Sequence, residues 1–228
     1  MMQKQTRWHV PSLFSILFAA LLLAACGGGD NGGGGPTVGS FQGTWQGAIQ
    51  QGNSEHTFAV VVDASGKITD LMVDGTSQNV TGTIAAVGGN IFSFALSNGT
   101  NGGFMIDSSA THAGFLDEFG SFGVVQKGGT TPLPTYALDD SVGSWAGYSL
   151  SLNNDFSLDQ TSGSSATINS SHNISGSSLT IPFTGNLTSA DSFGKFPGTW
   201  TTTSSGNGNL AAWMSEDKTF MASWECQG

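Results

Sequence analysis

Basic side chains are scarce in this sequence of 228 residues: lysine and arginine together number six, against sixteen aspartates and glutamates. Beyond residue 25 there is no arginine, and only Lys67, Lys127, Lys195 and Lys218 remain as cations. Proteins that bind a phosphate backbone need clustered lysines and arginines to release its counterions. We therefore expect no nucleic-acid partner, and the scattered acids are typical of a solvated surface.

Catalytic and metal-binding motifs are also missing. There is no Gly-x-Ser-x-Gly, no His-Glu-x-x-His and no pair of closely spaced cysteines. Ser54, Glu55 and His56 are adjacent, but neighbours along a strand point to opposite faces, which is unsuitable for a triad. The stretches at 63–67 and 70–75 contain acids but lack the acid spacing of a calcium loop, and they are typical of hairpin turns. We predict no catalytic residue, no metal, no cofactor and no enzymatic activity.

The first 25 residues have the pattern of a secretory signal peptide. Residues 1–11 hold Lys4 and Arg7 and no acid, and residues 12–25 form a largely apolar run. That run is shorter than the roughly 20 residues of a membrane-spanning helix and has the usual length of a signal's apolar core. A signal peptide over residues 1–25 is therefore predicted.

The sequence Leu23-Ala24-Ala25-Cys26 ends this segment and resembles the lipobox of bacterial lipoproteins at every position. The resemblance implies that Cys26 receives a diacylglyceryl group, that cleavage occurs just before it, and that the new amine is acylated, for example with palmitate. Gly27 follows the cysteine where aspartate would retain the protein in the inner membrane. Two or more acyl chains anchor a protein stably. We expect an outer-membrane protein whose membrane partner is reached through Cys26.

Residues 26–36 are predicted to be a flexible tether after the lipid-bearing cysteine. Seven of the nine residues from 27 to 35 are glycine, and such a coil has a root-mean-square reach of roughly 15–18 Å. Tethers of this composition resemble those of surface-displayed lipoproteins. With Cys26 acylated, Cys226 has no partner for an intramolecular disulfide. Cys226 is either a reactive thiol or a small buried hydrophobic residue, and its alternating strand context favours the second.

The remaining sequence predicts an all-β fold. No stretch beyond Cys26 has apolar residues at helical spacing, whereas residues 56–74, 90–97 and 147–153 alternate apolar and polar side chains. Clusters of glycine, asparagine, aspartate and serine interrupt these runs every eight to twelve residues, as in an antiparallel barrel or sandwich. The polar stretch 161–178 is predicted to be a loop.

Two segments repeat one hundred residues apart. Gly-Thr-Trp-Gln-Gly at 43–47 matches Gly-Ser-Trp-Ala-Gly at 143–147, and residues 105–117 parallel residues 213–225. A Gly/Pro-rich linker at 128–135 separates the halves. We predict two tandem antiparallel meander domains, a β-barrel at 37–127 and a second β domain at 136–228.

The Gly-x-Trp on the first strand of each domain, followed by short strands, resembles the lipocalin-like or calycin superfamily. About eight candidate strands occur in 42–127, which suits such a barrel. In that superfamily the tryptophan packs across one end of the barrel, so the resemblance implies that Trp45 and Trp145 close their barrels. It implies no ligand-binding residues, and whether the second domain closes is left open.

The expected function is that of a non-enzymatic binding module at the outer membrane or cell surface, engaging an envelope or extracellular protein or glycan. The alternatives are a lipocalin-like carrier of a small apolar ligand and an inhibitor of an envelope enzyme. Interior volume discriminates between them. An apolar cavity of about 300–1,000 Å³ favours a carrier, and a filled barrel favours recognition by the exterior.

Overall fold

The chain folds into strands, turns and two short 3-10 helices. The structure, a computed structural model, describes residues 18–22, 36–130, 132–152, 158–178, 181–202 and 206–227. The 3-10 helices are η1 (Val38–Phe41) and η2 (Leu138–Ser141), and the described residues contain no α-helix. None of the helices in these ranges is long and apolar enough to cross a membrane. The prediction of an all-β fold is confirmed.

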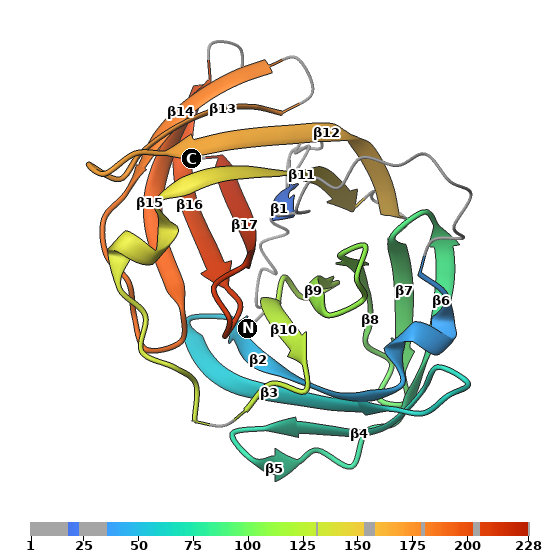
Figure 1. Cartoon of the computed structure of the whole chain (residues 1–228). Coiled ribbons are helices and arrows are strands. Elements are labelled where there is room, and N and C mark those ends of the chain that lie inside the picture. Colours follow the sequence, from blue (N-terminus) through green and yellow to red (C-terminus); the bar gives the residue numbers. More distant parts are fainter. Residues whose placement is uncertain are drawn as a thin grey trace, which may run out of the picture.

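Eight strands form the first barrel, and every neighbouring pair is antiparallel (Figure 1). The ring closes because β3 pairs with β4 as well as with β2, and β10 pairs with β2. A two-residue strand, β5 (Thr76–Ser77), extends β4 as a hairpin outside the ring. The barrel strands are β2 (Gly43–Gln51), β3 (Ser54–Val62), β4 (Lys67–Val73), β6 (Gly82–Gly88), β7 (Ile91–Leu96), β8 (Asn101–Ile106), β9 (His112–Asp117) and β10 (Phe122–Lys127).

A second closed barrel contains seven strands from the C-terminal half and one from the N-terminal segment. The strand β1 (Phe18–Leu22) lies between β11 and β17 and pairs with both. It takes the position that β10 holds in the first barrel, where β10 lies between β2 and β9. The second domain therefore closes through residues that the sequence places in the signal peptide. The other strands are β11 (Gly143–Leu152), β12 (Leu158–Ile168), β13 (Asn173–Ser178), β14 (Ile181–Leu187), β15 (Lys195–Thr202), β16 (Gly206–Met214) and β17 (Phe220–Gln227).

The prediction of a loop at 161–178 is wrong, because most of this stretch belongs to β12 and β13. Only a few inward positions carry apolar groups, and Ala166, Ile168 and Ile174 are buried. Gly176 also faces a ring, since a Cβ there would lie 2.8 Å from Cζ of Phe183. Serine and threonine at the remaining positions hide the alternation in the sequence.

The repeated segments adopt matching hairpins. In the turn between β8 and β9, the amide of Ala110 donates to the carbonyl of Asp107 at 3.0 Å. In the turn between β16 and β17, the amide of Lys218 donates to the carbonyl of Ser215 at the same distance. Ala110 and Lys218 also share a left-handed backbone, with φ of 56° and 62°. The parallel between 105–117 and 213–225 thus extends to local geometry.

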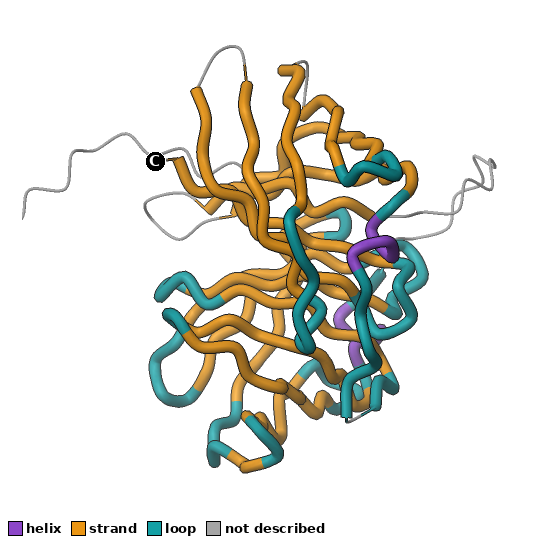
Figure 2. The backbone as a smooth tube through the Cα atoms, turned by 90° about the vertical axis from the view of Figure 1, so that its left-hand side faces the viewer, coloured by secondary structure: helices purple, strands orange, loops and turns teal. Residues whose placement is uncertain are grey.

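The two barrels pack against each other through residues of β2, β7, β8, β9 and β10 on one side and β16 and β17 on the other (Figure 2). The rings of Phe122 and Trp213 meet edge to face with centroids 5.0 Å apart. Gly114 lies so close to Ala222 that a Cβ on the glycine would come within 2.9 Å of the alanine Cβ. The buried residues of this contact are Ala48, Ile91, Met105, Leu116, Phe122, Val124, Trp213, Phe220 and Ala222.

Candidate ligand cavity

A cavity of about 510 Å³ lies inside the first barrel. Every strand of the ring contributes to its lining, which is mostly aliphatic and aromatic. Alternate residues point inward, so Phe58, Val60 and Val62 line the cavity from a single strand. The sequence predicts this shared face of β3, and the structure confirms it.

The floor of the cavity is formed by η1 and the start of β2. Phe41 and Trp45 are each 2% exposed, and the indole N–H of Trp45 donates to the carbonyl of Phe41 at 2.8 Å. The ring of Phe41 meets those of Phe92 and Phe104 edge to face, at 4.6 and 4.8 Å. Nζ of Lys127 lies 5.8 Å from the Trp45 ring centroid and donates to a backbone carbonyl of η1. This end is packed shut.

The walls are made of phenylalanine rings that lie over glycines on neighbouring strands. Gly47 pairs with Phe58 and Gly123 pairs with Phe115, and the two rings meet across both glycines with centroids 5.2 Å apart. A Cβ on Gly123 would come within 2.9 Å of the Phe115 ring. Rings held against the wall in this way leave the centre of the barrel open, so the glycines help to preserve its volume.

Polar side chains surround the mouth, at the strand ends opposite Trp45. Asp117 ends β9, and its Oδ1 accepts hydrogen bonds from the amides of Phe119 at 2.9 Å and Ser121 at 2.8 Å. Asp117 is the only ionisable residue in the lining. The polar lining residues are Gln51, Gln78, Asn98, Thr100, Asp117 and Ser121.

Several of the inward side chains remain partly exposed. Phe58, Val60, Leu71, Phe94 and Phe115 all line the cavity and are only half-buried. Removing such apolar surface from water is worth about 25 cal/mol per Å². An apolar molecule entering the cavity would therefore bind through the hydrophobic effect, with the polar mouth placed to meet a polar end.

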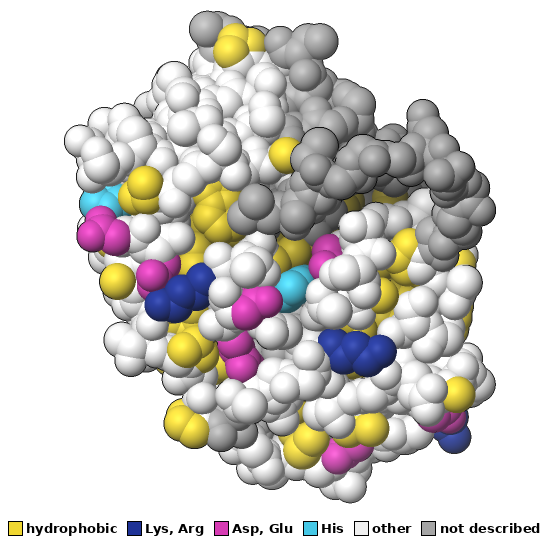
Figure 3. Space-filling view, in the orientation of Figure 1, with side chains coloured by type: hydrophobic (Ala, Val, Ile, Leu, Met, Phe, Trp, Pro, Cys, Tyr) yellow, Lys and Arg dark blue, Asp and Glu magenta, His cyan; other side chains and the backbone are white. Residues whose placement is uncertain are grey.

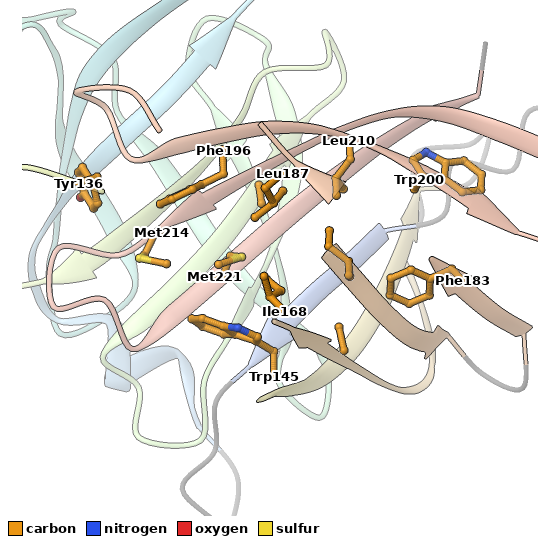
Figure 4. Close-up of a cluster of buried hydrophobic side chains, with 13 residues drawn as sticks. Tyr136, Trp145, Ile168, Phe183, Leu187, Phe196, Trp200, Leu210, Met214 and Met221 are labelled. Carbon is orange, nitrogen blue, oxygen red and sulfur yellow. The ribbon is translucent and has the colours of Figure 1, made fainter. Parts of the chain in front are cut away.

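Large side chains fill the middle of the second barrel, in contrast to the first. Figure 4 shows Trp145, Ile168 and Met221 pointing toward a common centre, and each is less than 5% exposed. The cluster continues along the barrel through aromatic and aliphatic residues from most of its strands. Its buried members are Tyr136, Trp145, Ala166, Ile168, Ile174, Phe183, Leu187, Phe196, Trp200, Leu210, Ala212, Met214 and Met221.

The two repeated tryptophans occupy matching environments. Trp145 is 3% exposed, and its indole N–H donates to the carbonyl of Ser141 in η2 at 2.9 Å, as Trp45 does to Phe41 in η1. Cys26 and the glycine tether lie outside the described residues. The backbone of Cys226 belongs to β17, where it pairs with Asn209.

Histidines that are isolated in the sequence each pair with an aspartate in the structure. His56 Nδ1 lies 2.7 Å from Asp74 Oδ2, and His172 Nε2 lies 2.8 Å from Asp139 Oδ1. The partner of His56 thus lies 18 residues away, directly after β4. No three histidine, cysteine or acidic residues in the described ranges are placed to hold a metal ion.

His112 lies between two carboxylates at the contact of the barrels. Its Nδ1 is 3.1 Å from Asp107 Oδ2 and its Nε2 is 2.9 Å from Asp217 Oδ2, while its ring stacks on Phe220. Burial disfavours the charged imidazole, but the two carboxylates outweigh burial and raise the pKa of His112. The pKa of Asp107 is lowered: burial opposes its charge, and the hydrogen bonds from His112 and Ser109 prevail. Sequence analysis misses this cluster because Asp217 is 105 residues away.

Charged side chains are sparse on the face of the molecule shown in Figure 3, most of which is neither charged nor hydrophobic. Two of the four described lysines form ion pairs: Lys195 Nζ lies 2.5 Å from Glu55, and Lys218 Nζ lies 2.7 Å from Asp140. The surface that the two barrels present to solvent thus carries few free cations among the described residues.

The sequence matches no protein-family model and no curated protein. Among solved structures, a protein of unknown function from the DUF3598 family of Nostoc punctiforme PCC 73102 is similar to this chain at a TM-score of 0.33 and 12% identity. The match covers 82% of this chain and 97% of that one.

Proposed function

We propose that the first barrel is a carrier domain that holds a small apolar molecule in its lumen. The observation that supports this proposal is the cavity of about 510 Å³ with a mostly apolar lining. This volume lies within the roughly 300–1,000 Å³ of small-molecule sites. It favours the carrier over a module that recognises its partner by the exterior alone. The exterior of the second barrel, with its filled interior, remains the better candidate for contacting an envelope or extracellular protein or glycan.

We also propose that the protein acts as a lipid-anchored, lipocalin-like outer-membrane protein. The support is the lipobox at residues 23–26 and the glycine tether after it. Cleavage before Cys26 would remove β1 and leave β11 and β17 without the strand between them. The cavity lies in the other barrel, and none of its lining comes from β1. The anchor and the ligand site can therefore be tested separately.

The carrier proposal is tested by filling the lumen. Val60→Trp places an indole inside the cavity, and we expect it to weaken binding of the uncharged dye Nile red at least tenfold. Val87→Trp is the matched control, because Val87 is 51% exposed on β6 and does not line the cavity. Binding is measured by fluorescence titration, with circular dichroism to show that both variants fold. Equal dye affinity in folded Val60→Trp and Val87→Trp would reject the lumen as the site.

The anchor is tested by Cys26→Ser. Without the thiol no diacylglyceryl group can attach, so we expect the variant to move from the membrane to the soluble envelope fraction. Detergent phase partitioning of cell extracts measures the change. A wild-type protein that partitions into the aqueous phase would overturn the lipobox interpretation.

A further inference from the structure

The charges around the cavity narrow the class of ligand. Among the lining residues there is no lysine, arginine or histidine, and Asp117 is the one ionisable group. Glu118 stands at the same end and accepts a hydrogen bond from the amide of Asn101 at 2.9 Å, whereas Asp74, which directly follows the lining residue Val73, is paired with His56 at 2.7 Å. A ligand head at the mouth would therefore meet negative charge.

No lysine lines the cavity, and Lys195, which lies beside the mouth, is already bound to Glu55, the partner of Gln50 on β2. Lys67 begins β4 and Lys127 ends β10, both at the floor end of the barrel. Lys195 pairs with Glu55 at the contact between barrels, and Lys218 pairs with Asp140 in the second domain. A carboxylate drawn into the cavity would thus lose its water without gaining a cation from the lining, which is unfavourable.

The shape of the cavity suits a molecule with one chain and a small head. Trp45 at the floor and Gln51 at the mouth are six residues apart on β2, which is roughly 20 Å along the strand. The side chain of Gln51 is exposed at the mouth, where its amide can bond an uncharged head. Rings along the walls would contact the chain.

We propose that the cavity selects a single-chain amphiphile with an uncharged hydroxyl or ester head and discriminates against the corresponding carboxylate. This inference rests on the proposed carrier function and adds to it a preference by charge. The preference arises at Asp117 and its acidic neighbour Glu118, while the apolar lumen supplies most of the affinity.

The test is displacement of Nile red from the full chain at neutral pH by dodecanol and by dodecanoate, both below their aggregation concentrations. We expect dodecanol to bind at least tenfold more tightly than dodecanoate. Asp117→Asn keeps the oxygen that accepts the amides of Phe119 and Ser121 and removes the charge. We expect it to tighten dodecanoate binding severalfold and to leave dodecanol binding unchanged.

Asp63→Asn is the matched control. Oδ1 of Asp63 caps a turn in the same way, accepting from the amides of Ser65 at 2.8 Å and Lys67 at 3.0 Å, but it lies at the floor end. We expect this variant to retain the wild-type preference. Equal or tighter binding of dodecanoate by the wild-type protein would overturn the charge preference and leave the carrier intact. A preference for dodecanol over dodecanoate that Asp117→Asn does not reduce would also overturn the charge preference. Failure of Nile red and of both amphiphiles to bind would instead reject the carrier function.

Discussion

Trp45→Ala is expected to lower the free energy of unfolding of the first barrel by about 3–5 kcal/mol, the usual range for truncating a buried aromatic side chain. Trp45 is 2% exposed, packs on Phe41 and donates the hydrogen bond that satisfies the Phe41 carbonyl. Its loss leaves a void at the floor and an unpaired carbonyl. Because a domain of this size is only marginally stable, a loss of this size could leave the first barrel unfolded in most of the molecules. Urea unfolding followed by circular dichroism measures the change.

Two further variants separate packing from hydrogen bonding. Trp45→Phe keeps an aromatic ring but cannot donate to Phe41, so we expect a smaller loss of about 1–3 kcal/mol. Trp145→Ala is the equivalent change in the second barrel and should destabilise that barrel instead. An unchanged unfolding curve for Trp45→Ala would contradict the prediction that Trp45 closes the first barrel.

The alternation of apolar residues was sufficient to predict β3, β4 and β7 of the first barrel. Phe58, Val60 and Val62 share a face in the sequence pattern, and the structure places all three on the lumen. The same reasoning failed at 161–178, because its inward positions are small or widely spaced. Alternation depends on a contrast between inward and outward side chains, and serine-rich strands provide little contrast.

The walls of the cavity could not be predicted from the sequence. Nothing in the sequence distinguishes Gly47 and Gly123 from other glycines. Only the strand register shows that Phe58 and Phe115 lie opposite them. Register depends on turn geometry and closure of the ring, which no local pattern contains. A prediction from alternation alone therefore yields the inward residues but not the volume between them.

The strand β1 was not predicted for a different reason. An apolar run after two basic residues matches a signal peptide, and the same residues also satisfy the open edges of β11 and β17. Both outcomes are compatible with a run of residues without charge, which can form a signal core or a strand between two others. The signal peptide stays a prediction from Lys4, Arg7 and the lipobox, while the pairing of β1 belongs to the uncleaved chain.

The cluster around His112 is expected to make stability depend on pH. A neutral imidazole has one donor and one acceptor, whereas a carboxylate only accepts, so both contacts are hydrogen bonds only when the ring is protonated. The raised pKa of His112 means that its contribution is fully present below the unfolded value of about 6.5 and is lost as pH rises through the folded pKa. The lowered pKa values of Asp107 and Asp217 contribute stability above about 4 that is lost in acid. The cluster is therefore strongest between about pH 4 and 6.5.

The change to make is His112→Asn, which removes the titrating ring at the contact of the barrels. For the wild type we expect the free energy of unfolding to fall above pH 6.5, with a slope of at most about 1.4 kcal/mol per pH unit for one proton. In His112→Asn that slope should disappear. The variant should also lose about 3 kcal/mol of unfolding free energy at pH 6, because Asp107 stays largely buried without its partner.

His56→Asn is the control: His56 pairs with Asp74 on the first barrel alone, so this variant should keep the wild-type slope. Urea unfolding at a series of pH values between 5 and 9 measures both quantities. A His112→Asn slope equal to that of the wild type would show that the titration lies elsewhere, whereas its loss would show that one proton, held between Asp107 and Asp217, links the two barrels.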